Sequence, residues 1–477
     1  MPELSFSRLI SARAHSAPDD VVVIADEVLT AAELDRRSNR LARAYVALGV
    51  RQDDLVAVAL PNTAEFVIAC AAIWKAGATP MPMSPTLDSG EQAAIERLAR
   101  PTLMVGRRPA TASITWARSG FIPDQDLPDS ELPDSWASCW KAPTSSGSTG
   151  VPKVVRAAAP ALADPGRHVA AFLPRKAVQL VSGPIWHSAS FTYAFRGLLS
   201  GHRLVILPGF DETRVLTSIA EHRVSWMLLS PTMIHRLMRV PADGRERFDV
   251  SSLETVLHMG APCAPTDKRA LIRWLGPHRV VEVYAGSESN GLTMIRGDDW
   301  LQHPGSVGQP IGGTELKVLR RDGSTAAPRE IGEVWMRRGP EPAYTYVGRR
   351  SRRTADGWDS LGDAGFLDED GHLTIIDRVA DLIVSEAIDI YPAEIERVLE
   401  EHPLVRGALA YGVPDDLLGQ AIEAVVDVAG AVVDEVDLRD FVRAQLDQVR
   451  VPRRIRIQND PVRSDAGKAR RPRNLAR

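Results

Sequence analysis

The sequence has little of what marks a secreted, membrane-spanning or metal-stapled protein. Its 477 residues include only three cysteines, Cys70, Cys139 and Cys263, which are far apart and lack CxxC spacing. We therefore expect neither a disulfide framework nor a zinc site, and interpret the cysteines as small buried residues. The longest apolar run, Phe66–Trp74, is about half as long as a membrane helix requires, so we expect no membrane span.

The charge balance is nearly even, because 57 Lys and Arg residues face 61 Asp and Glu residues, for a net charge of −4. Without a basic excess, we expect no nucleic-acid partner. The N-terminus has neither a basic, apolar leader nor a lipidation motif, which makes the cytoplasm the expected location.

Three common sequence motifs are also missing. The chain contains no GxxxxGK[ST], no GxGxxG and no GxSxG. These absences argue against a Walker-type nucleotide site, a dinucleotide-binding fold and a hydrolase nucleophile elbow. No His or acidic residues have metal-ligand or paired-carboxylate spacing that context supports.

What is present is an alternation of β-branched runs and amphipathic stretches between residues 21 and 288, which is typical of a parallel sheet with crossover helices. The predicted strands are Leu55–Leu60, Thr102–Val105, Gln179–Gly183, Arg203–Leu207, Trp226–Leu229, Thr255–Met259 and Val280–Tyr284. The predicted helices between them include Ala64–Ala76, Glu212–His222 and Thr266–Leu275. The fold class is therefore α/β, with doubly wound, mostly parallel sheets.

The pattern changes twice along the second half of the chain. Short strands separated by Gly, Asp and Pro turns predict a small β subdomain at about 300–377. Beyond it, strands are predicted at Asp381–Val384, Gly407–Tyr411, Ala421–Val428 and Arg454–Gln458, and helices at Tyr391–Leu399 and Val436–Leu446. We therefore expect a large N-terminal domain, residues 1–378, and a small mobile α+β domain, residues 379–477.

The most informative segment is Thr144–Lys153, which reads Thr-Ser-Ser-Gly-Ser-Thr-Gly-Val-Pro-Lys. Hydroxyls and glycines at this density let backbone N–H groups converge on an anion, and Lys153 adds a positive charge. A flexible linker has a similar composition, but the apolar Val154 and Val155 follow at once. The segment therefore predicts a phosphate-binding loop.

With this loop, the chain resembles the adenylate-forming superfamily of acyl-CoA synthetases, aryl-CoA ligases, luciferases and nonribosomal peptide adenylation domains. In its overall sequence pattern it is most similar to fatty-acid or bile-acid CoA ligases. Further motifs of the superfamily follow in order along the chain. The matching segments are Leu29–Leu34, Lys75–Ala78, Pro184–His187, Gly260–Pro262, Tyr284–Glu288, Gly362–Asp363, Asp377–Arg378, Ile390–Glu396 and Gly467–Lys468.

The resemblance implies ATP and Mg²⁺ as cofactors, with CoA as a possible further one, and a small-molecule acid as substrate. It implies catalytic roles for Lys468, Glu288 and His187, with Glu288 as the metal ligand through its carboxylate oxygen. Lys468 would stabilise charge at the reacting phosphate. The implied nucleotide-binding residues are Thr144, Ser145, Ser146, Gly147, Ser148, Thr149, Lys153, Gly260, Ala261, Pro262, Tyr284, Ala285, Ser287, Asp363 and Arg378.

Lysine usage supports two of these positions. The chain has seven lysines and fifty arginines, so it supplies a generic positive charge as arginine. Lysine at 153 and 468, the latter near Arg470 and Arg471, indicates sites where a compact ammonium is needed rather than a planar guanidinium.

The chain departs from the family pattern where a glycine-rich loop usually lines the CoA channel, because Glu386 and Ala387 replace two glycines. The two added side chains, and the negative charge of Glu386, should hinder entry of CoA, whose thiol is attached to a polyanionic molecule. We therefore keep several hypotheses open. In the first, the adenylate passes to CoA, and in the second, it passes to an amine or a carrier protein. In a third, the enzyme activates nitrite to diazotise an aryl amine in secondary metabolism, and in the last, the chain is a degenerate binding protein.

Overall fold

The β-branched runs of the first half of the chain assemble into a large, mainly parallel sheet. The computed structural model describes residues 2–145, 152–385, 388–415 and 417–463. The nine strands have the order β17-β16-β15-β14-β13-β11-β12-β2-β3, with parallel pairing from β15 through β2 and antiparallel strands at both edges. They are Gln309–Pro310, Leu292–Arg296, Val280–Ala285, Thr255–His258, Trp226–Leu229, Val178–Val181, Arg203–Ile206, Val21–Ile24 and Val28–Thr30, in that order.

A second, wholly parallel sheet has the order β5-β4-β6-β7. Its strands are β4 (Leu55–Ala59), β5 (Thr79–Pro82), β6 (Leu103–Gly106) and β7 (Thr115–Arg118). Every residue of helix α3 (Ala64–Lys75) except Glu65 is buried, and the helix packs against α1 (Phe6–Ser16) and α2 (Ala31–Ala47). An all-round apolar helix needs such a position, and Trp74 on α3 meets Phe195 on α5 (Ser188–Leu199) with ring centroids 4.8 Å apart.

The remaining helices of the large part lie on connections between strands, and several of them begin at residues suited to helix starts. Asp211 and Ser230 accept the backbone N–H groups of Arg214 and Met233, and Pro265 occupies the first position of its helix. These helices are α4 (Ser89–Ala99), α6 (Glu212–His222), α7 (Pro231–Arg239), α8 (Ala242–Arg245), α9 (Pro265–Leu275) and α10 (Gly297–Trp300).

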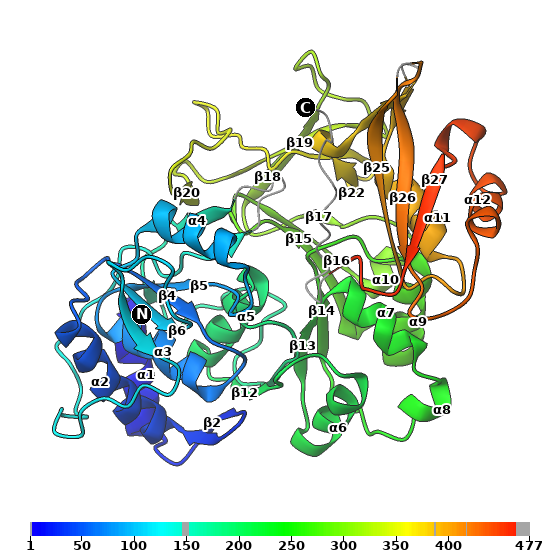
Figure 1. The fold of residues 1–477 in the computed structure, drawn as a ribbon. Coiled ribbons are helices and arrows are strands. Elements are labelled where there is room, and N and C mark those ends of the chain that lie inside the picture. Colours follow the sequence, from blue (N-terminus) through cyan, green and yellow to red (C-terminus); the bar gives the residue numbers. More distant parts are fainter. Residues whose placement is uncertain (1, 146–151, 386–387, 416, 464–477) are drawn as a thin grey trace.

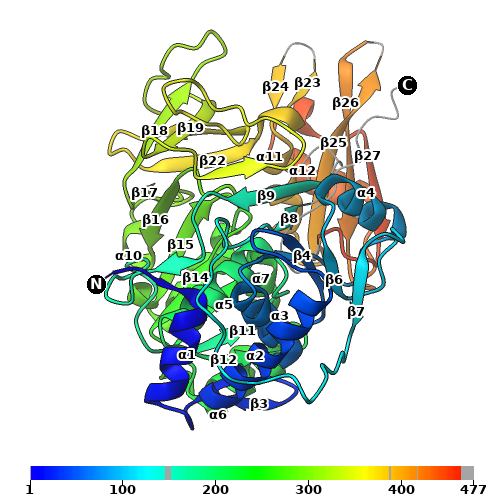
Figure 2. The same cartoon turned by 90° about the vertical axis from the view of Figure 1, so that its left-hand side faces the viewer.

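A small antiparallel sheet stands beside the large one (Figure 2). Its order is β18 (Thr314–Leu319), β19 (Gly332–Arg338), β21 (Asp363–Leu367) and β22 (Leu373–Arg378). A further three-stranded sheet joins β8 (Thr144–Ser145), β9 (Lys153–Ala157) and β20 (Tyr344–Tyr346), all antiparallel. This pairing places the segment that follows the predicted phosphate loop beside residues almost 200 positions later in the chain.

The last described elements form a unit with its own apolar core (Figure 1, orange to red). It contains β25 (Gly407–Asp415), β26 (Gly419–Asp427) and β27 (Arg454–Gln458), with α11 (Pro392–Glu400), α12 (Glu435–Arg443) and the hairpin β23 (Ile383–Ser385) and β24 (Ile388–Ile390). Arg239 of α7 donates to the carbonyl oxygens of Pro403 and Val405, at 3.2 and 3.0 Å, and so ties this unit to the large part.

The fold is therefore mixed α/β with a large N-terminal and a smaller C-terminal part, as predicted. The predicted strand Asp381–Val384 is wrong at its start, because Val379–Asp381 forms a 3₁₀ turn and the strand begins at Ile383. Cys263 is half-buried, whereas Cys70 and Cys139 are buried as expected. Within the described ranges, no helix combines the length and the apolar character that a bilayer crossing demands.

Candidate active site

A cavity of about 1300 Å³ lies where the large part, the small antiparallel sheet and the C-terminal unit meet. The strands β14 and β15 end at it, and β22, α11 and the start of β25 contribute to its wall. Ligands of open α/β sheets usually bind beyond the carboxyl ends of parallel strands. The lining includes Lys141, Lys153, His187, Glu288, Asp363 and Arg378.

Three predicted nucleotide-binding residues converge at one side of the cavity. Tyr284 is the residue before the last one of strand β15, and its hydroxyl donates to Asp363 Oδ2 at 2.5 Å. Arg378 Nε lies 2.7 Å from Asp363 Oδ1, because Asp363 and Arg378 are direct partners across β21 and β22. Burial and the neighbouring carboxylate raise the pKa of Tyr284 well above its usual value. The phenol therefore stays a hydrogen-bond donor, and Asp363 presents a negative charge held by two donors.

Glu288 is held by a tyrosine that the sequence analysis did not identify. Tyr346 donates its hydroxyl to Glu288 Oε1 at 2.6 Å, and the ammonium of Lys153 lies 5.4 Å from the centre of the Tyr346 ring. Burial, followed by the charge of Glu288, raises the pKa of Tyr346. Position 286 has no room for a side chain. A Cβ added to Gly286 would lie 2.9 Å from Glu288 Oε2 and 2.3 Å from a methyl carbon of Leu361.

Helix α5 forms another wall of the cavity. His187 is the residue before its first turn and lines the cavity, as do Thr192 and Tyr193. The buried Lys141 donates to Thr192 Oγ1 at 2.5 Å. Burial, helped by the positive charge of Arg196, lowers the pKa of Lys141 to about 7.

The other predicted residues divide into three groups. Gly260, Ala261 and Pro262 line the cavity just after β14, and Ala285 and Ser287 line it after β15. Thr144 does not belong to the lining, because its hydroxyl donates to the carbonyl oxygen of Pro82 at 3.1 Å. Ser145 pairs with Lys153 across β8 and β9. Ser146, Gly147, Ser148, Thr149 and Lys468 lie outside the described residues, as do Glu386 and Ala387.

Sequence reasoning missed Tyr346 and Lys141. Tyr346 lies 58 residues from its partner Glu288, and its strand β20 pairs with β9, so the contact arises from the tertiary fold. A signal for Lys141 did exist, because it is one of only seven lysines and stands three residues before Thr144.

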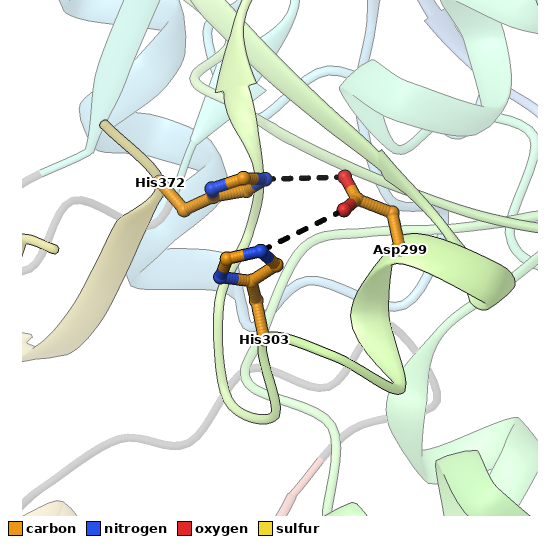
Figure 3. A group of neighbouring side chains, drawn as sticks. All are labelled: Asp299, His303 and His372. Atoms are coloured by element: carbon orange, nitrogen blue, oxygen red, sulfur yellow. Dashed lines mark hydrogen bonds and ion pairs between the residues drawn. The ribbon is translucent and has the colours of Figure 1, made fainter. Parts of the chain in front are cut away.

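A second group of potential metal ligands is formed by side chains that do not line the cavity (Figure 3). Asp299 lies 3.1 Å from His372 Nε2 and 3.9 Å from His303 Nε2, and His303 Nδ1 lies 3.0 Å from Asp368. The two imidazole rings stack with centroids 3.7 Å apart and an angle of 17° between their planes. Nearly parallel rings direct their lone pairs side by side rather than to one point. We therefore interpret this cluster as a structural junction between α10 and the β21–β22 turn.

The cavity thus brings together the carboxylates of Glu288 and Asp363, the guanidinium of Arg378 and the ammonium of Lys153. This set suits a nucleoside triphosphate with its metal.

Comparison with known proteins agrees. Residues 10–347 match the family model described as AMP-binding enzyme, and residues 394–468 match the AMP-binding enzyme C-terminal domain. The chain belongs to the AMP-binding enzymes.

Among curated relatives of this AMP-binding enzyme, a feruloyl-CoA synthase from Amycolatopsis sp. is 30% identical, over 92% of each chain. A long-chain-fatty-acid–CoA ligase from Bacillus subtilis is also 30% identical, but the chain spans about half the length of that relative, at 52%. Among solved structures, the amide bond synthetase McbA from Marinactinospora thermotolerans superposes with a TM-score of 0.81. It is 26% identical, and the match covers 97% of this chain and 98% of McbA. The relatives thus include CoA ligases and an amide bond synthetase.

Proposed function

We propose that this enzyme activates an acid with Mg-ATP to form an acyl adenylate and pyrophosphate. A carboxylate oxygen of the acid attacks the α-phosphorus, and the bond to the bridging oxygen breaks so that pyrophosphate leaves with the electron pair. The observation that carries the proposal is the convergence of Glu288, Asp363 and Arg378 on one cavity beside Lys153. These residues are spread over more than 200 positions of sequence, and each has a distinct use in holding a nucleotide.

In this proposal Asp363 accepts hydrogen bonds from the ribose hydroxyls, and Arg378 binds the same sugar. Both are already fixed in place, since Tyr284 and Arg378 hold the two oxygens of Asp363 at 2.5 and 2.7 Å. Gly260, Ala261 and Pro262 border the adenine, with Ala285 and Ser287 on the facing segment. Residues 144–153 hold the β- and γ-phosphates, with Lys153 as their cation. Preorganised donors of this kind need little rearrangement during the reaction.

We assign Glu288 as the protein ligand of Mg²⁺, and its environment fits that role. One oxygen accepts from Tyr346, which leaves the other oxygen for the ion. Mg²⁺ usually takes one or two carboxylates and completes its shell with phosphate oxygens and water. The ion would neutralise charge on the phosphates, while Lys468 and His187 would act at the reacting acid.

We place the domain boundary after Arg378, so that residues 379–477 form a lid that closes for adenylation and rotates to admit the acceptor. The acceptor is CoA in the first form of the proposal, in line with the relatives named as CoA ligases. The resemblance to an amide bond synthetase supports an amine as the alternative acceptor. Nitrite as the activated acid, and a carrier protein as acceptor, remain predictions, as does a cytoplasmic location.

The test is release of pyrophosphate by purified protein with aryl, cinnamoyl and fatty acids and with nitrite, each with Mg-ATP. Mass spectrometry of the products with CoA or with an amine then identifies the acceptor. We expect acid-dependent pyrophosphate release and an acyl-AMP. CoA-stimulated turnover would exclude the amine as sole acceptor. The absence of acid-dependent pyrophosphate release across the panel would overturn the proposal and favour a non-catalytic binding protein.

A further inference from the structure

Lys141 differs from the other fully buried lysines of the chain. Lys75 and Lys268 are each 1% exposed, and each pairs with a buried carboxylate, Asp35 at 2.6 Å and Glu282 at closer contact. Lys141 is 4% exposed, yet forms no ion pair with any carboxylate in the described ranges. Among the described residues, its ammonium donates to the neutral hydroxyl of Thr192 and lies 5.1 Å from the centre of the Trp140 ring, so both contacts are to uncharged groups. An ammonium without a counter-charge is costly to bury, so this position requires an explanation.

The surroundings of Lys141 add positive charge instead of removing it. Arg196 lies one turn beyond Thr192 on α5, with its guanidinium over the face of Trp140 at 5.5 Å, and it too has no ion-pair partner among described residues. Within the part of the chain that the structure describes, Glu288 is the one carboxylate whose charge acts on Lys141, and it acts in the same direction as Cys139. Glu288 makes no ion pair with it, and in the proposed function its charge is used by Mg²⁺. A deficit of negative charge therefore remains at this wall of the cavity.

Lys141 has an ammonium hydrogen to offer to a ligand. Thr192 Oγ1 donates to the carbonyl oxygen of Ser188 at 2.6 Å, so it can only accept from Lys141, and this orients the lysine at the cavity wall. The other two ammonium hydrogens of Lys141 have no acceptor among the residues that the structure describes. Tyr193 and Met259 line the same cavity, so the polar group is set among apolar contacts. Binding sites of this kind use a few polar groups to fix the orientation of a ligand.

We propose that the acid substrate carries a second anionic oxygen group, besides the carboxylate that is activated, and that Lys141 binds this second group. The inference rests on the proposed function and names the class of its substrate, a dianionic acid. A second ammonium on the attacking carboxylate would reduce its nucleophilicity, and Lys468 is already assigned to the reacting atoms. The unpaired charge of Lys141 is therefore better matched to an anion that does not react.

The experiment compares matched pairs of acids that differ by one carboxylate. The pairs are benzoate with isophthalate and with terephthalate, cinnamate with 4-carboxycinnamate, and hexanoate with adipate. Pyrophosphate release is measured for the wild type, Lys141→Met and Lys176→Met, the last as a control because Lys176 is exposed and does not line the cavity. We expect the wild type to prefer at least one diacid over its monoacid by tenfold or more in kcat/KM.

In Lys141→Met, the kcat/KM for that diacid should fall by at least tenfold, mainly through KM, while the monoacid is unchanged or improved. Thermal unfolding checks that the variant is folded, and Lys141→Arg, which keeps the charge, should recover part of the preference. The inference is overturned if no diacid is preferred, or if Lys141→Met lowers both members of a pair alike, since Lys141 would then serve the reacting carboxylate.

A binding measurement separates failure of this inference from failure of the proposed function. Calorimetric titration of the free protein with the same diacids requires no turnover. If no acid releases pyrophosphate, but the wild type binds a diacid at least tenfold more tightly than Lys141→Met does, the adenylation proposal fails and the anion site stands. If acids are activated without any effect of Lys141 on the choice between them, the adenylation proposal stands and the anion site fails.

Discussion

Tyr346 and Glu288, 58 residues apart, are joined by a hydrogen bond of 2.6 Å at the wall of the cavity. The bond fixes one oxygen of the proposed metal ligand and therefore the direction of the other. Groups that orient a metal ligand typically contribute ten- to a hundredfold to metal affinity. The pair provides a direct test of the metal assignment.

Replacing Tyr346 with Phe should raise the Mg²⁺ concentration needed for half-maximal pyrophosphate release by roughly tenfold, with a smaller effect at saturating metal. Tyr344→Phe is the matched control, because Tyr344 lies on the same strand, and its hydroxyl donates at 2.8 Å to the buried Asp359. Equal metal requirements in the two variants would contradict a role for Glu288 as magnesium ligand.

Asp363→Asn should weaken nucleotide binding. The change keeps the shape of the side chain but removes the charge that pairs with Arg378 at 2.7 Å. Hydrogen bonds to charged groups contribute about 1.5–3 kcal/mol, so we expect the KM for ATP to rise by roughly 10- to 100-fold. Tyr284→Phe, which leaves the carboxylate in place, should have the milder effect. An unchanged KM for ATP in Asp363→Asn would remove the ribose assignment.

Much of the large sheet could be predicted because its central strands are short apolar runs that fit no other position. In this sheet, the bounds of Trp226–Leu229 were predicted correctly, and the predicted strand Val280–Tyr284 ends one residue before the observed one. Outside it, Arg454–Gln458 in the C-terminal unit was also predicted with its observed bounds. Helix α2 was not predicted, although Thr30 and Glu33 form a reciprocal capping box at its start. That signal was present, but it was used only as part of a family motif.

The site was predictable only where a residue belongs to a recognised motif. Asp363 and Glu288 were found in this way, whereas Tyr346 and Lys141 contact the site through strand pairing and helix packing between distant segments. Such contacts have no local pattern in a single sequence. The strand predicted at Asp381–Val384 started two residues too early, because Val379–Asp381 forms a 3₁₀ turn and the observed strand begins at Ile383.

Breaking the buried pair of Lys268 and Glu282 should destabilise the protein strongly. Both side chains are almost fully buried, at 1% and 7% exposure. Removing one partner of such a pair typically costs 3–5 kcal/mol, because the other charge remains buried, whereas replacing both by apolar residues is often neutral. Lys268→Met should therefore lower the free energy of unfolding in urea by about this amount, and Lys268→Met with Glu282→Met should recover most of it. A fully additive second loss would contradict the coupling.

Lys141 should make stability depend on pH. Its pKa in the folded protein is about 7, lowered by burial and by Arg196, with Cys139 and Glu288 acting in the opposite direction. An unfolded lysine titrates near 10.4, so the unfolded chain binds the additional proton between pH 7 and 10. The free energy of unfolding should therefore rise with pH in this window, by up to ~1.4 kcal/mol per pH unit, and this contribution should be constant below pH 7. Lys141→Met should lack it, so parallel profiles for the two proteins would contradict the burial of an unpaired ammonium.

Lys468→Ala should suppress adenylate formation while leaving ATP binding intact. Lys468 lies outside the described residues, so this prediction rests on the motif and on the rarity of lysine in the chain. Removal of one preorganised donor at a reacting centre typically reduces kcat by 100- to 1000-fold. Arg470→Ala is the matched control, since it removes a nearby positive charge of the type that the chain uses generally. Lys468→Arg should not restore activity, because a planar guanidinium cannot replace a compact ammonium at a crowded phosphate. ATP affinity by calorimetry and single-turnover pyrophosphate release separate binding from chemistry, and normal release by Lys468→Ala would overturn the assignment.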